Sequence, residues 1–122
     1  MSTFTELHLH VEGTLEPKYL VKLQAKNADA QTENLDDIRK KYSFSNLQDF
    51  LSSYYKVMQM LSTSKDYSEL ADRYFQRVAY TGLVRVEAFF DPQTHAANGN
   101  SFELVFSALA QMHFSKLRTV WN

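Results

Sequence analysis

The chain has 122 residues, of which 44% are hydrophobic and 14% aromatic, and its formal net charge is -1. This length corresponds to about one domain, and the scattered Lys and Arg residues form neither a basic stripe for nucleic acid nor a basic helix face for a membrane surface. The chain contains no cysteine, which excludes a disulfide framework, a thiol nucleophile and a zinc ribbon.

The N-terminal residues Met1 to Glu6 contain no positive cluster followed by an apolar run, so no signal peptide is expected. No apolar run is long enough to span a bilayer. We therefore expect a cytoplasmic protein, with the nucleus as a second possible location. We expect no nucleic-acid or membrane partner, and the oligomeric state stays open.

Alternating apolar and polar residues predict a first strand over Thr5 to Val11. His8, His10 and Glu12 share one parity of this alternation, so they are expected to face the same side. The strand is expected to end at Gly13, because glycine adopts backbone conformations closed to other residues.

Further elements follow from the spacing of apolar residues. We expect helices from Pro17, over Leu35–Lys41, from Ser45 to Leu61 and over Asp66–Thr81, then a strand over Leu83–Phe90 and a helix over Phe102–Leu117. Ser45 with Gln48 matches a capping box, and Gly82 is expected to cap the helix before it. Residues 27–33 and 94–100 are expected to be loops. This order predicts α/β units with parallel strands.

The pair His8 and His10 is the sharpest chemical signal in the chain. Residues two apart in a strand point to the same face, so the two imidazoles can share one metal ion. Zinc favours histidine nitrogens and takes three or four ligands. The pair therefore supplies half a metal site at most, and two water-exposed histidines at a strand end are the alternative.

Three sequence blocks resemble the adenosine/adenine deaminase family. The segment Glu6–Pro17 (E-L-H-L-H-V-E-G-T-L-E-P) resembles the family's opening motif of Glu-Leu-His-x-His, a hydrophobic residue, an acidic residue or Asn, Gly, and Ser or Thr. The block F-S-N-L at 44–47, followed by Phe50, is similar to the helix over the family's active-site mouth. The block V-E-A-F-F-D-P-Q-T-H at 86–95 is similar to the second strand and following loop of the adenine deaminase branch.

The resemblance implies an α/β fold: a partial TIM (β/α)8 barrel of a metal-dependent hydrolase, with its first two strands and the intervening helices. Residues 1–110 are then the N-terminal part of the barrel domain. Residues 111–122 are an atypical tail that leads into no recognisable third strand. The chain is accordingly expected to be an N-terminal fragment of a deaminase.

The resemblance also implies Zn2+ as cofactor, with His8 and His10 as its first two ligands. In the family, zinc polarises a water that attacks C6 of the purine, and ammonia leaves. The other zinc ligands and all catalytic residues are expected outside this chain, so we expect the chain alone to lack a complete site.

Glu12, Gly13 and Phe50 are the expected substrate contacts. Adenosine deaminases have an aspartate at the position of Glu12, where it contacts the ribose, and a longer glutamate would reach into that space. The resemblance therefore favours conversion of adenine to hypoxanthine in purine salvage. Conversion of adenosine to inosine, and a non-catalytic fragment that acts only as an interaction module, stay open as alternatives. For Glu12 itself, a helix cap or a solvated carboxylate is the other possibility.

Five further side chains stand outside the expected metal and substrate contacts or have two possible roles. Tyr54 and Tyr55 are expected to lie in the core, since aromatic residues at helical spacing are usually core residues. Arg85 is the candidate partner of Glu87 on the second strand. His95 follows that strand and is expected either in a loop or in contact with a ligand.

Overall fold

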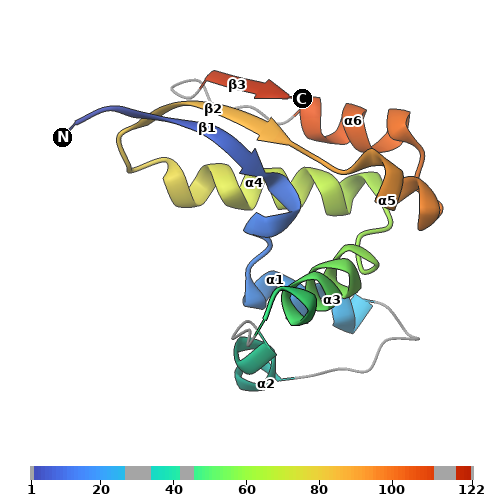
Figure 1. The fold of residues 1–122 in the computed structure, drawn as a ribbon. Coiled ribbons are helices and arrows are strands. Elements are labelled where there is room, and N and C mark those ends of the chain that lie inside the picture. The colour runs from blue at the N-terminus through green and yellow to red at the C-terminus, as the bar shows by residue number, and fades with distance from the viewer. Residues whose placement is uncertain (1, 27–33, 42–45, 112–117, 122) are drawn as a thin grey trace.

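The computed structural model describes residues 2–26, 34–41, 46–111 and 118–121 (Figure 1). Strands and helices alternate along the chain. In order they are β1 (Phe4–His10), the 3-10 helix η1 (Val11–Thr14), α1 (Pro17–Lys26), α2 (Leu35–Lys41), α3 (Leu47–Met58), α4 (Ser64–Val78), β2 (Leu83–Phe89), α5 (Pro92–Ala97), α6 (Phe102–Gln111) and β3 (Arg118–Trp121).

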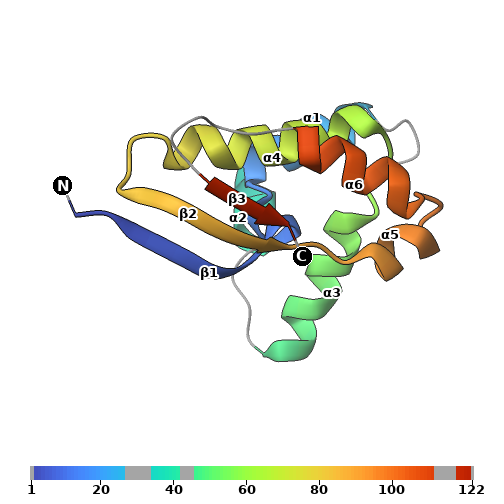
Figure 2. The ribbon, with the colours of Figure 1, turned by 90° about the horizontal axis from the view of Figure 1, so that it is seen from above.

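The strands form a three-stranded sheet in the order β1-β2-β3, and both neighbouring pairs are parallel. His10 lies opposite Phe89 in the first pair, and Val86 lies opposite Thr119 in the second. In Figures 1 and 2, α4 and α6 lie along the sheet, whereas α1, α2 and α3 form a group beyond the end of β1. The predicted α/β architecture with parallel strands is thus confirmed.

The third strand corrects a prediction made from the sequence. Residues 118–121 were expected to belong to a tail without a strand, but β3 pairs with β2 over four residues. Thr119, Val120 and Trp121 are β-branched or aromatic and suit a strand. Four residues are too few for alternation to reveal one. The predicted helix to Leu117 is seen as α6 up to Gln111, and residues 112–117 lie outside the described ranges.

Two helix starts also differ from the predictions. The N-cap of α3 is Asn46, whose side chain accepts a hydrogen bond from the Asp49 N–H at 2.8 Å, while the predicted cap Ser45 lies outside the described residues. Residues 92–97 form helix α5 where a loop was expected. Asp91 caps α5 by accepting from the Thr94 N–H at 3.2 Å, and Pro92 suits the first turn because it has no N–H to leave unsatisfied.

Helix α4 starts earlier than predicted, at a capping box. The Thr63 hydroxyl accepts from the Asp66 N–H at 3.2 Å, and the Asp66 carboxylate accepts from the Thr63 N–H at 3.1 Å. Gly82 does not cap the end of α4, since among the described glycines it is Gly99 that has a positive φ. Gly82 instead allows the backbone at Ser2 to pass close to it, because a Cβ at Gly82 would lie 1.9 Å from the Ser2 carbonyl oxygen.

The hydrophobic core lies between one face of the sheet and helices α4 and α6, and it continues on α1, which packs against α4. Val86 and Ala88 of β2 meet Leu70 of α4 and Val105 of α6 in this core, and all four are almost fully buried. The opposite face of the sheet carries His8 and His10, which are exposed. The core therefore fixes which face of β1 and β2 presents polar side chains.

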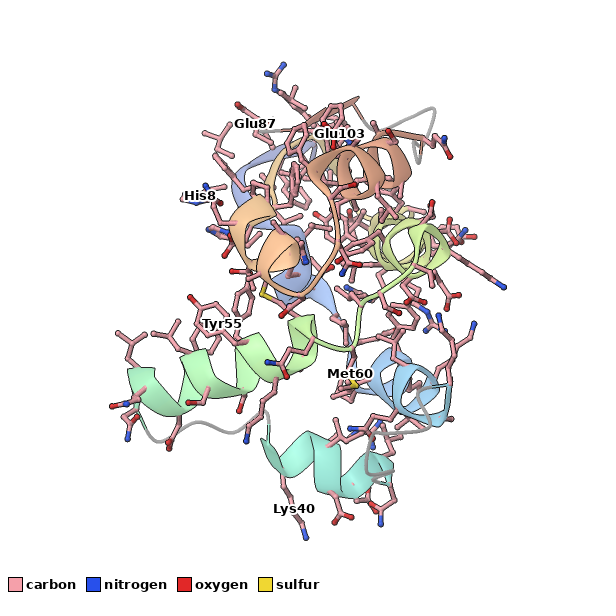
Figure 3. All side chains as sticks on the ribbon, turned by 90° about the vertical axis from the view of Figure 1, so that its right-hand side faces the viewer. His8, Lys40, Tyr55, Met60, Glu87 and Glu103 are labelled. Atoms are coloured by element: carbon pink, nitrogen blue, oxygen red, sulfur yellow. The ribbon has the colours of Figure 1, made fainter. Side chains whose placement is uncertain are left out.

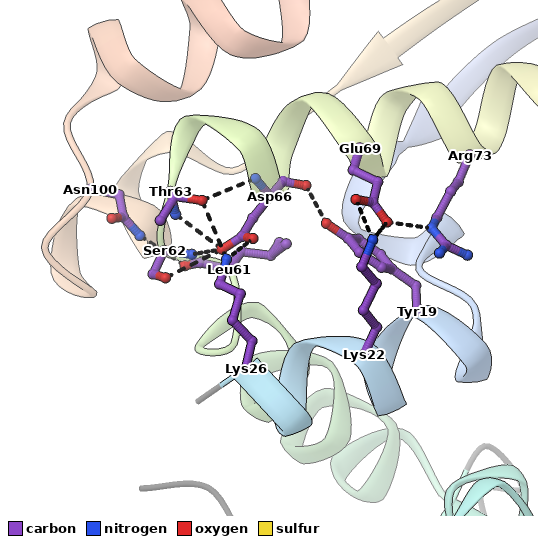
Figure 4. A network of polar contacts seen from close by, with 10 residues as sticks. All are labelled: Tyr19, Lys22, Lys26, Leu61, Ser62, Thr63, Asp66, Glu69, Arg73 and Asn100. Carbon is purple, nitrogen blue, oxygen red and sulfur yellow. Dashed lines mark hydrogen bonds and ion pairs between the residues drawn. The ribbon is translucent and has the colours of Figure 1, made fainter. Parts of the chain in front are cut away.

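Polar contacts join α1 to α4 (Figure 4). Lys22 bonds both carboxylate oxygens of Glu69 at 2.9 Å, and the buried Tyr19 hydroxyl donates to the Asp66 carbonyl oxygen at 2.7 Å. Lys26 pairs with the Asp66 carboxylate. These contacts hold α1 against α4. Because α1 follows η1 in the chain, they also fix the path of the chain after η1.

Replacing Asp66 by Asn should lower the free energy of unfolding by about 1–2 kcal/mol at neutral pH. Burial alone raises the pKa of Asp66, but hydrogen bonds from Lys26, Ser62 N–H and Thr63 N–H lower it below its ordinary value of 3.8. A carboxyl group whose pKa is lower in the folded than in the unfolded protein stabilises the fold at pH values above its unfolded pKa. That stabilisation is lost as the pH falls through the folded pKa.

Urea denaturation at several pH values tests this expectation. The difference in unfolding free energy between wild type and Asp66→Asn should be constant above about pH 5. It should shrink as the pH falls below 3.8, the ordinary pKa of an aspartate. Asp72→Asn, the same change on α4 outside the capping box, is the control. A difference that grows toward acid pH would contradict the assignment.

Candidate functional site

The two histidines of β1 meet on the exposed face of the sheet. Their Nε2 atoms are 3.0 Å apart, as the parity of the strand predicted. The Phe89 ring of β2 supports them from the same face, with ring centroids 4.7 Å from His8 and 5.8 Å from His10. Figure 3 shows His8 projecting outward on this face, with Tyr55 rising from α3 on the same side of the molecule.

The spacing of this histidine pair fits a shared zinc ion. Two nitrogens bound tetrahedrally at zinc lie about 3.3 Å apart, so a shift of a few tenths of an ångström brings the pair to that geometry. Both Nε2 lone pairs must then be free, which places the ring protons on Nδ1. Within the described residues no group of three or more His, Cys, Asp or Glu could hold a metal, so His8 and His10 alone would not complete such a site.

Glu12 is buried rather than placed on the strand face with the histidines. The strand ends at His10, one residue earlier than predicted, and Glu12 lies in η1 with 2% of its surface exposed. Its Oε2 accepts from the Asp91 N–H at 2.7 Å and bonds His95 Nε2 at 2.8 Å. Its Oε1 is buried without a hydrogen-bond partner among the described residues. Glu12 is therefore neither a solvated carboxylate nor a strand residue.

A pocket of about 450 Å³, open to solvent, lies between η1 and α3. Its walls are mostly apolar and contain one carboxylate. The lining residues are Glu12, Gly13, Leu15, Phe50, Ser53, Tyr54 and Val57. A Cβ at Gly13 would meet no atom within 4 Å and the φ of Gly13 is not positive, so this glycine leaves space in the pocket and is not required by the backbone. The three predicted substrate contacts, Glu12, Gly13 and Phe50, thus line one pocket.

The aromatic residues of α3 lie at the pocket and on the surface. Phe50 stacks on Tyr54 at 6.0 Å between ring centroids, and both rings line the pocket. Tyr55 is 44% exposed, so the prediction that Tyr54 and Tyr55 are core residues is wrong. Burial, together with the nearby Glu12 charge, raises the pKa of Tyr54 above its ordinary range. The Tyr54 hydroxyl therefore stays protonated beside the carboxylate, without a well-directed hydrogen bond to Oε1.

His95 lies in a helix and not in the loop that was one of its two expected places. It lies in α5 with 1% of its surface exposed, and its Nδ1 bonds the Tyr67 hydroxyl at 2.9 Å. The Asn100 side chain donates to the Tyr67 oxygen at 3.1 Å and to the Leu61 carbonyl at 3.0 Å. Burial raises the pKa of Tyr67 to about 12, which keeps its hydroxyl a donor. A continuous row of hydrogen bonds thus runs from the pocket carboxylate into the core.

Arg85 and Glu87 of β2 form the pair that the sequence predicted. The Arg85 Nε lies 3.7 Å from the Glu87 Oε2, and both side chains are about one third exposed. This ion pair lies on the strand face opposite the core and close in sequence to Phe89. It accounts for a carboxylate in the middle of a strand without assigning it to the pocket.

Comparison with known proteins identifies the family. The model of the adenosine deaminase family matches residues 4–119. The chain belongs to the adenosine deaminase family. It is 45% identical to the adenine deaminase of Rhodospirillum rubrum over 105 residues, which cover 85% of this chain and 31% of that protein. Identity to the adenine deaminase of Caulobacter vibrioides is also 45% over 105 residues, covering 85% and 30% of the two chains.

Solved structures give the same assignment at the level of the fold. The adenine deaminase of Arthrobacter aurescens superposes with a TM-score of 0.87 at 34% identity, over 99% of this chain and 39% of that one. A zinc-bound amidohydrolase from Burkholderia ambifaria superposes with a TM-score of 0.78 at 18% identity, over 98% and 35% of the two chains, and this similarity concerns the fold alone. The predicted partial barrel of a metal-dependent hydrolase is confirmed.

The chain spans about a third of the length of the curated relatives it matches, 31% for the Rhodospirillum rubrum protein. Among the described residues, no helix is both long and apolar enough to cross a membrane. The described site thus consists of two parts: a histidine pair on the sheet and an apolar pocket with one buried carboxylate.

Proposed function

We propose that this chain contributes two zinc ligands and the base-binding pocket of a zinc-dependent adenine deaminase, which converts adenine to hypoxanthine in purine salvage. The observation that carries the proposal is the buried Glu12 carboxylate in an apolar pocket two residues after the histidine pair. The adenine deaminases among the relatives and the zinc-bound structural neighbour support it. A location in the cytoplasm stays a prediction.

In this proposal His8 and His10 hold the zinc through their Nε2 atoms. Bound zinc supplies Lewis-acid activation of a water molecule. The residues of the pocket bind and orient the purine: Phe50 offers an aromatic face to the ring, and the apolar walls exclude water. Glu12 fixes the orientation of the base, since a buried carboxylate needs hydrogen-bond donors from its surroundings.

The free Oε1 of Glu12 favours a free base over a nucleoside. Oε2 already has two donors, whereas Oε1 has no hydrogen bond of good geometry among the described residues, and the Tyr54 hydroxyl lies near the carboxylate. An ionised carboxylate only accepts hydrogen bonds, so Oε1 is suited to accept one from an N–H of the ligand. Adenine has a ring N–H at the nitrogen that in adenosine carries the ribose. A nucleoside would therefore lack this donor and leave the carboxylate oxygen unsatisfied.

Replacing Glu12 by Asp should shift turnover toward adenosine. In a polypeptide with the complete site, the ratio of kcat/KM for adenosine to that for adenine should rise about 10-fold or more, because the shorter side chain withdraws Oε1 and frees space. Steady-state ammonia release from both substrates measures this ratio. Glu103→Asp, the same change at an exposed position of α6 outside the pocket, is the control, and an unchanged ratio in Glu12→Asp would contradict the role of Glu12.

Assays of the 122-residue chain itself distinguish the proposed function from the alternative of a non-catalytic interaction module. The proposal expects zinc and adenine turnover only when the remaining ligands are supplied, because zinc takes three or four ligands and two are described here. Stoichiometric zinc together with turnover by this chain alone would show that it completes the site unaided. Absence of turnover in the longest polypeptide that contains the chain would favour the module.

A further inference from the structure

We propose that His95 is a positioning residue for substrate selection: it holds the Glu12 carboxylate so that Oε1 alone faces the base. The inference rests on the proposed function, because it explains how that pocket selects a free base. The observation is the buried contact of 2.8 Å between His95 Nε2 and Glu12 Oε2, which joins α5 to η1 across 83 residues of sequence.

The hydrogen-bond row assigns the tautomer of His95. Glu12 Oε2 already accepts from the Asp91 N–H and a carboxylate oxygen is an acceptor, so His95 Nε2 is the donor of the second bond to Oε2. His95 Nδ1 is then an acceptor and receives the Tyr67 hydroxyl proton, while the Tyr67 oxygen accepts from Asn100. His95 and the Tyr67 hydroxyl thus each donate one hydrogen bond and accept one, and the row ends in the Asn100 contact with the Leu61 carbonyl.

This row orients the carboxylate more firmly than one bond could. The Asp91 N–H also donates to Oε2, so both donors meet the same oxygen and leave the other free. A half-turn of the carboxylate only exchanges two equivalent oxygens, while the imidazole, which lies edge-on to the Tyr67 ring at 4.9 Å between centroids and 87° between planes, keeps its nitrogen directed at the same place. The pocket therefore presents one acceptor in one direction.

Two replacements of His95 separate positioning from support of the fold. His95→Leu removes the donor to Oε2 and should raise KM for adenine about 10-fold or more, with kcat changed less than about 3-fold and KM for adenosine little changed. His95→Gln retains an N–H at the reach of Nε2 and should restore KM for adenine to within about 3-fold of wild type. Both are measured in the longest polypeptide that contains the chain, with Ala97→Ser on α5 as the control.

The opposite results would overturn the proposal. Equal losses for both substrates, or no rescue by His95→Gln, would mean that His95 supports the fold alone. Tyr67→Phe offers a second variant of similar volume that removes the donor to Nδ1. It should raise KM for adenine by a smaller factor than His95→Leu, and an unchanged KM would remove Tyr67 from the row.

Nitrogen-15 NMR of the histidine rings tests the contact without any substrate. We expect His95 to be protonated at Nε2 with Nδ1 as acceptor, and Glu12→Gln to shift the Nε2–H resonance of His95 while leaving the ring-nitrogen resonances of His8 unchanged. An Nδ1–H tautomer would overturn the proposal. If the wild type failed to turn over adenine, the proposed function would fail, whereas this spectrum would still decide the contact between His95 and Glu12.

Discussion

Replacing His10 by Ala should weaken zinc binding more than about 100-fold and abolish turnover in a polypeptide with the complete site. Loss of a residue that merely orients a ligand costs about 10- to 100-fold in affinity, and loss of a ligand costs more. The Nε2 of His10 lies 3.0 Å from that of His8, so its removal breaks the chelating pair. His8→Ala should have the same effect.

Metal analysis after dialysis, together with competition against a zinc indicator, measures this loss. Thr5→Ala on the same strand, exposed and away from the pair, is the control and should keep its zinc. Wild-type zinc content in both His8→Ala and His10→Ala would show that the exposed pair is no metal site. Added zinc at high concentration should restore part of the lost activity in the single variants only.

Replacing Leu70 by Ala should lower the free energy of unfolding by about 3 kcal/mol. Leu70 lies in α4 with 1% of its surface exposed, in the core cluster with Val86 of β2 and Val105 of α6. Removal of three carbon atoms leaves a cavity between helices that are held against the sheet. The loss therefore combines the transfer of apolar surface to water with the cost of the cavity.

Leu47→Ala is the matched control, because Leu47 lies in α3 with 71% of its surface exposed. Its unfolding free energy should stay within about 0.5 kcal/mol of wild type. Urea denaturation followed by circular dichroism measures both variants. Equal losses in the two variants would place α4 outside the core.

The elements around the histidine pair could be predicted because residues close together in the sequence determine them. Alternation in β1 placed His8 and His10 on one face, and the structure shows their nitrogens 3.0 Å apart. The start of α5 is equally local, since Asp91 accepts from the Thr94 N–H three residues later. In each case, residues two to four positions apart determine the geometry.

The surroundings of Glu12 could not be predicted because they join distant segments. Glu12 meets Asp91 and His95, which follow it by 79 and 83 residues. Strand parity assigned Glu12 to the face of the histidines, but the chain turns into η1 after His10 and carries Glu12 into the interior. Similarly, helical spacing placed Tyr54 in the core, because periodicity does not distinguish a core from the wall of a pocket.

The order of the sheet bears on how the chain folds. Each strand pairs with the strand that precedes it along the chain, with β2 beside β1 and β3 beside β2. A nascent chain therefore contains β1, α4 and β2 before β3 is made, so the strand pairing beside the two imidazoles involves only residues that precede β3.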